Sequence, residues 1–220
     1  MHSSRDPPMP SRAYNNASRL QQQAELKRQI AAAAAQLHAE KGALRTSWAD
    51  IAQAAGVSLP TVYKHYPDFE TLIPACVGHA GDSAPQLPVD LISSCPDLMA
   101  AARLLAEACD QRNAYYQPWL AWGEAGQLEP LARLLDEQRV GFTVLCRRVL
   151  QRHLPGDPRL DEMAAQWQAL LDFGFWNALV RHHKLPRAAV RRHTTQLLLA
   201  VTGPRPAAET SLRPKRKSTP

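Results

Sequence analysis

The side chains best suited to contact another molecule lie close together at residues 58–65, in the sequence S-L-P-T-V-Y-K-H. If this stretch is a helix with Val62 turned inward, its outer face combines hydroxyl, cationic, imidazole and apolar groups. Five residues make up this face: Leu59, Pro60, Thr61, Lys64 and His65. Such a mixture suits contact with phosphates and base edges in the major groove of DNA, although a solvated helical hairpin has a similar composition.

Other residue patterns do not provide chemistry of their own. The sequence contains no phosphate-binding glycine loop, nucleophile elbow or His-Glu-x-x-His pattern. Two groups could resemble metal ligands, namely His182 with His183 and His193, and Cys76 with His79. Both lack the second ligand pair of a structural zinc site, so these histidines are expected to be solvated or to cap helices. We therefore expect no catalytic residues, no metal and no cofactor, and we do not expect an enzyme.

Composition places the chain among ordinary globular proteins. It has 220 residues, of which 45% are hydrophobic and 21% charged, with a mean hydropathy of −0.35. No apolar run approaches the roughly 20 residues that cross a bilayer, and residues 1–10 lack the apolar core of a secretory signal. Four widely spaced cysteines suit reduced thiols. These features predict a cytoplasmic protein with no membrane partner.

The net charge of +6 is concentrated at the two ends of the chain. Residues 81–203 are neutral, whereas residues 204–220 have five basic residues and one acidic residue. Residues 1–17 have no hydrophobic period and are also basic. We expect a disordered basic arm at 1–17 and a disordered basic tail at 204–220, both able to attract phosphate.

Capping residues and hydrophobic spacing predict the first helices. Residues 18–41 have apolar positions three or four apart and end at Gly42. Ser47 with Asp50 forms a capping-box pattern for a helix at 47–55, and Ser58 begins a helix at 58–66. Two short helices joined by a tight turn, which glycine permits through positive φ, fit a helix-turn-helix. In it, Ile51, Val57 and Val62 would fill the angle between the helices.

The rest of the chain is also expected to be helical. A fourth helix after Asp68 is interrupted by Pro74, either as a kink that transmits effector binding or as the helix end. Residues 81–96 predict a domain boundary or flexible crossing. Helices follow at 97–116, 129–153, 157–183 and 187–202, with no strand pattern. The prediction is an all-α fold, with a three-helix DNA-binding domain at 18–80 and a larger helical domain at 81–203.

The segment at residues 30–75 closely resembles the DNA-binding domain of the TetR (tetracycline repressor) family. The matching positions are Ala34, Leu37, Gly42, Thr46, Ser47, Ile51, Ala52, Ala55, Gly56, Val57, Ser58, Thr61, Val62, Tyr63, His65, Tyr66 and Leu72. The resemblance covers about a quarter of the chain. It implies an all-helical, homodimeric transcriptional regulator, whose C-terminal domain forms the dimer interface and binds a small effector.

The resemblance also assigns roles within the helix-turn-helix. Ser47 would cap its helix and contact a phosphate, and Thr61 and Tyr63 would contact the DNA backbone. Lys64 and His65 would lie at the major groove, and Leu59 could touch a thymine methyl. The full candidate DNA-binding set is Ser47, Ala49, Ser58, Leu59, Pro60, Thr61, Tyr63, Lys64 and His65. The chain departs from the family at Phe69, where a lysine is frequent, and at Ala49, where a polar residue is frequent.

Clustered aromatic residues provide the candidates for effector binding. The predicted ligand-binding set is Tyr115, Tyr116, Trp119, Trp122, Phe142 and Trp167. Aromatic residues at helical spacing are also typical of a core or a dimer interface, and both alternatives stay open. For residues 167–176 an interface is favoured, because in the family the last two long helices pair across the dimer and Gly174 would permit close approach.

The predicted function is therefore that of a one-component regulator, most simply a repressor. A homodimer would bind a pseudo-palindromic operator in double-stranded DNA and be released by a small-molecule effector whose identity the sequence leaves unknown. An alternative is an architectural helix-turn-helix protein that binds DNA without a ligand. A third is a helical enzyme or adaptor that retains the motif without an operator.

Overall fold

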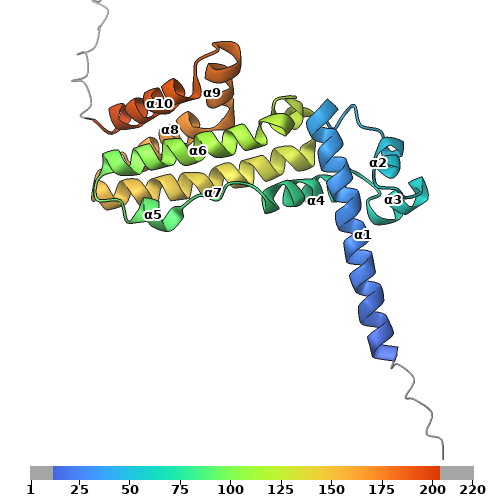
Figure 1. The fold of residues 1–220 in the computed structure, drawn as a ribbon. Coiled ribbons are helices and arrows are strands. Elements are labelled where there is room, and N and C mark those ends of the chain that lie inside the picture. The colour runs from blue at the N-terminus through green and yellow to red at the C-terminus, as the bar shows by residue number, and fades with distance from the viewer. Residues whose placement is uncertain (1–11, 204–220) are drawn as a thin grey trace, which may run out of the picture.

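The computed structural model describes residues 12–203, and within this range every element of regular secondary structure is a helix (Figure 1). The helices are α1 (Arg12–Lys41), α2 (Trp48–Ala54), α3 (Leu59–His65), α4 (Phe69–Asp82), α5 (Val89–Ser93), α6 (Leu98–Leu120), α7 (Glu129–His153), α8 (Leu160–Leu171), α9 (Phe173–Asn177) and α10 (Arg187–Thr202). Two short helices are the 3-10 helix η1 (Glu124–Gln127) and the π-helix η2 (Ala178–His182). The predicted all-α class is confirmed. No helix in the described range is long and apolar enough to cross a membrane.

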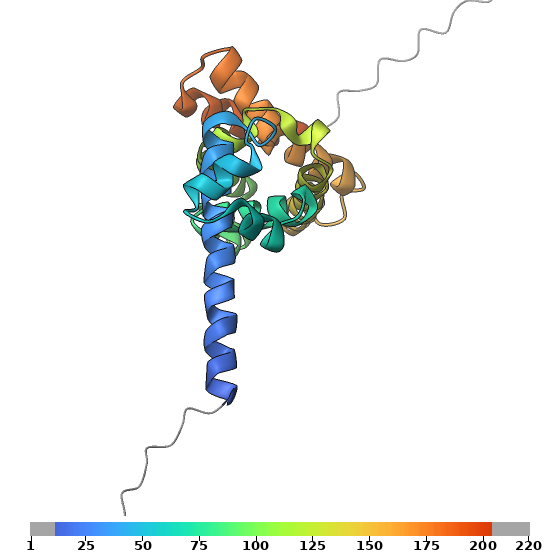
Figure 2. The same cartoon turned by 90° about the vertical axis from the view of Figure 1, so that its right-hand side faces the viewer.

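Helix α1 begins earlier than its sequence predicts. It starts at Arg12 rather than Ser18, so residues 12–17 of the predicted disordered arm are helical. Its first half extends away from the other helices in both views (Figures 1 and 2). Residues 1–11 and the predicted tail at 204–220 lie outside the described range.

The first four helices enclose a small core of their own. Its fully buried side chains include Ile30, Ile51, Val62 and Leu72, one from each of α1 to α4. Gly42, with φ of +85°, ends α1 and turns the chain toward α2. This core fixes the angle between α2 and α3.

Helix α4 joins this unit to the rest of the protein without a break. It continues through Pro74 to Asp82, so the expectation that Pro74 ends the helix is wrong. Pro74 is exposed, and the Glu70 carbonyl that loses its helical hydrogen bond lies on an exposed residue, where water can replace that bond. Helix α4 packs against both α1 and α7, so contact between the two parts is extensive.

The predicted flexible crossing at residues 81–96 is packed. It contains α5, whose Ile92 is fully buried, and Cys95 joins the same core. Helix α5 packs against α6 and α7 through Ile92, whereas Leu91 on the same helix stays exposed.

The larger core lies among α6, α7, α8 and α10. Its most buried members include Leu105, Leu150, Met163, Trp167 and Leu198. The helix predicted at 157–183 is broken at Asp172, which has extended backbone (φ −64°, ψ 152°) and accepts a hydrogen bond from the Gly174 amide at 2.9 Å. A polar N-cap thus starts α9 where the sequence predicted continuous helix.

The aromatic residues expected at a dimer interface are mostly internal. Trp167 is fully buried, and Trp176 is 5% exposed, so neither is available to a second chain. The Trp176 Nε1 donates to Asp110 on α6 at 2.7 Å. These side chains hold one protomer together.

Candidate DNA-binding face and ligand cavity

The helix-turn-helix is built by local caps and one left-handed turn. The Ser47 hydroxyl and the Asp50 carboxylate form the predicted capping box, and Lys41 binds Asp50 at 2.7 Å. These bonds, with that of Lys41 first, lower the pKa of Asp50 to about 2. Gly56 has φ of +66°, and the amide of Val57 donates to Ala52 at 3.0 Å. The predicted turn is therefore present, with glycine at its left-handed position.

The core orients α3 so that one face points outward. Val62 is fully buried, and the Tyr66 hydroxyl donates to the Lys27 carbonyl of α1 at 3.1 Å. Most of the predicted DNA-binding residues are exposed, while Thr61 and His65 are half-buried; the exposed ones are Ser47, Ala49, Ser58, Leu59, Pro60, Tyr63 and Lys64. Within the motif, the structure thus brings together the hydroxyl, cationic and apolar groups expected on this face.

Hydroxyl groups at the start of α3 are already hydrogen-bonded. Ser58 Oγ accepts from the Thr61 amide and lies 2.7 Å from Thr61 Oγ1. Burial and the nearby charges of Lys27 and Lys64 lower the pKa of His65, which favours the neutral imidazole. A neutral imidazole has one donor and one acceptor for a base edge.

The departure from the family at Phe69 has a structural counterpart. The rings of Phe69 and Trp48 lie 5.7 Å apart, and Trp48 also contacts the Tyr63 ring at 5.3 Å. Phe69 on α4 therefore makes an aromatic contact with Trp48 on α2, and Trp48 in turn packs against the ring of Tyr63 on α3.

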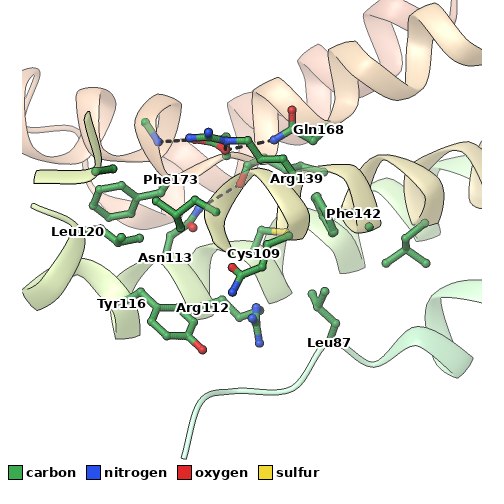
Figure 3. A pocket seen from close by; sticks show the side chains of 18 of the residues that line it. Leu87, Cys109, Arg112, Asn113, Tyr116, Leu120, Arg139, Phe142, Gln168 and Phe173 are labelled. Carbon is green, nitrogen blue, oxygen red and sulfur yellow. Dashed lines mark hydrogen bonds and ion pairs between the residues drawn. The ribbon is translucent and has the colours of Figure 1, made fainter. Parts of the chain in front are cut away.

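A cavity of about 590 Å³ lies in the larger helical unit (Figure 3). Three residues of the predicted ligand-binding set line it: Tyr116 and Trp119 from α6 and Phe142 from α7. Cys109 also contributes, and burial raises the pKa of its thiol to about 12. This volume is in the range of small-molecule sites.

The other three predicted aromatic residues do not line this cavity. The Tyr115 hydroxyl donates to the Ala80 carbonyl at 2.7 Å, and Trp122 Nε1 donates to Ala39 at 3.3 Å. Trp167 is in the core, where its Nε1 donates to the Leu198 carbonyl at 2.8 Å. Their rings pack between helices because each polar N–H or O–H finds a backbone acceptor there.

Sequence reasoning missed the polar residues of the cavity. They include Arg112, Asn113, Glu124, Arg139, Arg148, Gln168 and Asp172. A usable signal existed on α6, where Cys109, Arg112, Tyr116 and Trp119 recur at steps of three or four and thus share a helix face.

Cavity residues also contact the end of α1, next to the helix-turn-helix. The Glu124 carboxylate accepts from the amides of Ala43 and Leu44 at 2.7 and 3.2 Å. Trp119 Nε1 donates to the Ala35 carbonyl of α1 at 2.7 Å. A molecule that displaces either side chain therefore acts directly on the segment that leads into α2.

A smaller cavity of about 100 Å³ adjoins the first one, between α1, α4, α6 and α7. The two cavities share seven lining residues, among them Tyr116, Trp119 and Glu124. His38 of α1 lines the smaller one and is 5% exposed, and its Nε2 has no hydrogen-bond partner. Burial lowers the pKa of His38 to about 4, against an opposing effect of Glu124.

The pKa of His38 predicts a loss of stability in acid. The pKa of His38 in the folded state lies below the unfolded value of about 6.5. Its contribution to the free energy of unfolding is therefore fully present above pH 6.5 and is lost as the pH drops toward 4. The contribution reaches about 3 kcal/mol at most. Urea unfolding at pH 7.5 and 4.5 should therefore show a smaller decrease for His38→Leu than for wild type. His193→Gln, which changes an exposed histidine, should behave as wild type; an unchanged decrease in His38→Leu would contradict the prediction.

Within residues 12–203, no group of three or more His, Cys, Asp or Glu side chains could hold a metal ion. The four cysteines are buried and free, as predicted for structural thiols.

Comparisons with known proteins agree with this geometry. Residues 30–76 match the family profile described as bacterial regulatory proteins, tetR family. A search among curated proteins finds no match. The chain is 20% identical to a transcriptional regulator from Rhodococcus sp. Rha1, with a TM-score of 0.61 over 80% of this chain and 95% of that one.

Two further solved structures are similar over nearly their whole length. One is described as a TetR-family transcriptional regulator, from Mesorhizobium loti, with 22% identity and a TM-score of 0.60 over 81% of this chain and 95% of that one. The other is NalD, the secondary repressor of the MexAB-OprM multidrug efflux pump in Pseudomonas aeruginosa, with 20% identity and a TM-score of 0.58 over 81% and 96%.

The class of the protein follows from the motif and the fold together. Residues 30–76 match the tetR-family profile, and the described helices α2 and α3 within them form a helix-turn-helix. The chain as a whole has the fold of TetR-family transcriptional regulators, and the resemblance predicted from the sequence is confirmed.

Proposed function

We propose that the protein is a transcriptional repressor that binds a pseudo-palindromic operator as a homodimer and is released by a small-molecule effector. The DNA-binding unit is residues 18–80, extended by the start of α1, and the effector and dimerisation unit is residues 81–203. The observation that carries the proposal is the outward face of α3, which presents Leu59, Tyr63 and Lys64 on a rigid three-helix support. One such helix per chain reads few base pairs, so two copies are needed.

Effector release is supported by the route from the cavity to α1. Glu124 and Trp119 line the cavity and hydrogen-bond to α1 or to the turn after it. A ligand that binds better when these bonds are rearranged favours a second orientation of α2 and α3, by no more than its difference in affinity between the two states. The repressor role is supported by the description of NalD as a repressor.

Dimerisation is proposed through the outward faces of α8 and α10, which pack side by side. Their exposed residues are small or apolar in part, including Ala165, Ala169, Ala188 and Leu197, the last 41% exposed. This is the pair of helices that the family resemblance implies for the interface.

Leu197→Asp is therefore expected to convert the dimer into a monomer, because a charge would be buried between two chains. Size-exclusion chromatography with light scattering measures the change. The control is Leu91→Asp on α5, a residue 63% exposed, which should stay dimeric. A dimeric Leu197→Asp protein would place the interface elsewhere.

The proposal is tested by immobilising the purified protein and selecting DNA from a random pool, then adding small molecules to the selected complex. A two-fold symmetric site released by a ligand supports it. A ligand-independent architectural protein would instead enrich weak, asymmetric sequences and keep them.

A further inference from the structure

The charged side chains of the larger cavity indicate the chemical class of its ligand. Three arginines and two carboxylates line it: Arg112, Arg139, Arg148, Glu124 and Asp172. The lining therefore has an excess of one positive charge. Which of these groups already have partners decides which charge a ligand can carry.

Both carboxylates are engaged by protein donors at each oxygen. Glu124 accepts two backbone amides from Ala43 and Leu44. Asp172 Oδ2 accepts from Arg139 Nε at 3.2 Å, and its Oδ1 accepts from the Gly174 amide at 2.9 Å. A cationic ligand would have to compete with bonds that hold α1, α7 and α9 in place.

The arginines are not equally engaged. Arg139 is neutralised by Asp136 at 2.8 Å as well as by Asp172. Arg112 and Arg148 have no carboxylate partner among the ion pairs of residues 12–203. Two cations at the cavity are therefore available to an anion.

Arg112 is held in a fixed orientation without being saturated. Its Nη1 donates to the Pro85 carbonyl at 2.6 Å, and its guanidinium lies over the Tyr116 ring at 5.4 Å. Figure 3 shows it between Tyr116 and Leu87 at one side of the cavity. A guanidinium has five N–H donors, and a planar fork that is already oriented matches a carboxylate at little entropic cost.

The remaining wall is largely apolar. Its side chains include Leu87, Leu120, Phe142, Leu145, Leu171 and Phe173. We propose that the effector is an amphipathic organic anion, an apolar aliphatic or aromatic body with a carboxylate that binds Arg112 and Arg148. The effector role of this ligand rests on the proposed function. Its chemical class follows from the residues that line the cavity.

The experiment compares ligands that differ only in their charged group. The probes are decanoate, decanol and decylamine, and 1-naphthylacetate with its alcohol and amine counterparts. Binding to the full-length protein is measured by quenching of tryptophan fluorescence, because Trp119 lines the cavity. At least one carboxylate should bind 10-fold or more tightly than both of its matched compounds.

Matched variants assign the effect to the two arginines. Arg112→Gln and Arg148→Gln should each weaken carboxylate binding at least 5-fold and leave alcohol binding unchanged. Arg103→Gln on α6 and Arg152→Gln on α7, which lie on the same helices outside the cavity, should bind as wild type does. If Arg112→Gln does not fold because its bond to Pro85 is lost, Arg148→Gln and the comparison of matched ligands on the wild-type protein still test the ligand class.

Equal or tighter binding of an amine or alcohol, or no binding of either carboxylate, would overturn the inference. Operator release is recorded separately by fluorescence anisotropy. Release of the operator by an amine would leave the proposed function intact and contradict the anionic ligand class. Tight carboxylate binding without release would instead support the ligand class and contradict effector control.

Discussion

Replacing Lys64 with alanine is expected to weaken operator binding roughly 10-fold to 100-fold without lowering thermal stability. Lys64 is exposed on the outer face of α3 and, within residues 12–203, has no ion-pair partner. The slope of log K against log salt should also decrease by about one, because one phosphate contact is lost. Anisotropy titrations of labelled operator at several salt concentrations measure both effects.

In the same titrations, Tyr63→Phe distinguishes a polar contact of the Tyr63 hydroxyl from the packing of its ring. It keeps the ring that packs on Trp48 at 5.3 Å and removes only the hydroxyl, so weaker binding would indicate a lost polar contact. Thr61→Ala is less direct, because its hydroxyl also lies 2.7 Å from the Ser58 cap. Lys184→Ala removes the same charge from the loop before α10 and serves as the control. If Lys64→Ala and Lys184→Ala titrated alike, α3 would not be the reading helix.

Asp110→Ala is expected to lower the free energy of unfolding by about 3 kcal/mol. The Asp110 carboxylate is 2% exposed and accepts from Arg187 at 2.8 Å, Arg191 at 3.0 Å and Trp176 at 2.7 Å. Burial raises the pKa of Asp110, but these hydrogen bonds outweigh it and the pKa lies below its ordinary value. Alanine would leave the buried Trp176 N–H unpaired, while both arginines turn to solvent.

Urea denaturation of three variants tests this cluster. Asp110→Asn keeps an acceptor for Trp176 and should cost less than Asp110→Ala. Glu107→Ala changes an exposed acid on the same helix and should stay within about 0.5 kcal/mol of wild type. Because Trp176 anchors α9, whose Phe173 lines the cavity, Asp110→Ala should also weaken ligand binding. If Asp110→Ala lowered the free energy of unfolding by less than about 1 kcal/mol, apolar contacts alone would hold α6 and α10 together.

The helix-turn-helix could be predicted because its signals are local. Ser47 with Asp50, Gly56 and Ser58 each fix a backbone position through contacts within four residues, and each is present as expected. The continuity of α4 could not be predicted in this way. Whether Pro74 ends a helix depends on solvent access around it and on the packing of α4 against α1 and α7.

The cavity was predicted less well because a side chain's surroundings depend on distant helices. Trp119 and Trp167 are both aromatic residues at helical spacing, yet one lines the cavity and the other fills the core. Met163, Ala164 and Leu171 share the helix face of Trp167, and this apolar pattern favours a core position for its ring. For Arg112, no local pattern indicates that its partner is a carbonyl rather than a carboxylate.

We propose that two copies of α3 read one symmetric operator. It is tested most directly by sequencing the DNA that wild-type and Lys64→Ala proteins select from a random pool. Wild type should enrich a two-fold symmetric site, with half-sites one helical turn or a small multiple apart, and Lys64→Ala should enrich it far less. An asymmetric motif, or the same enrichment by both proteins, would contradict it.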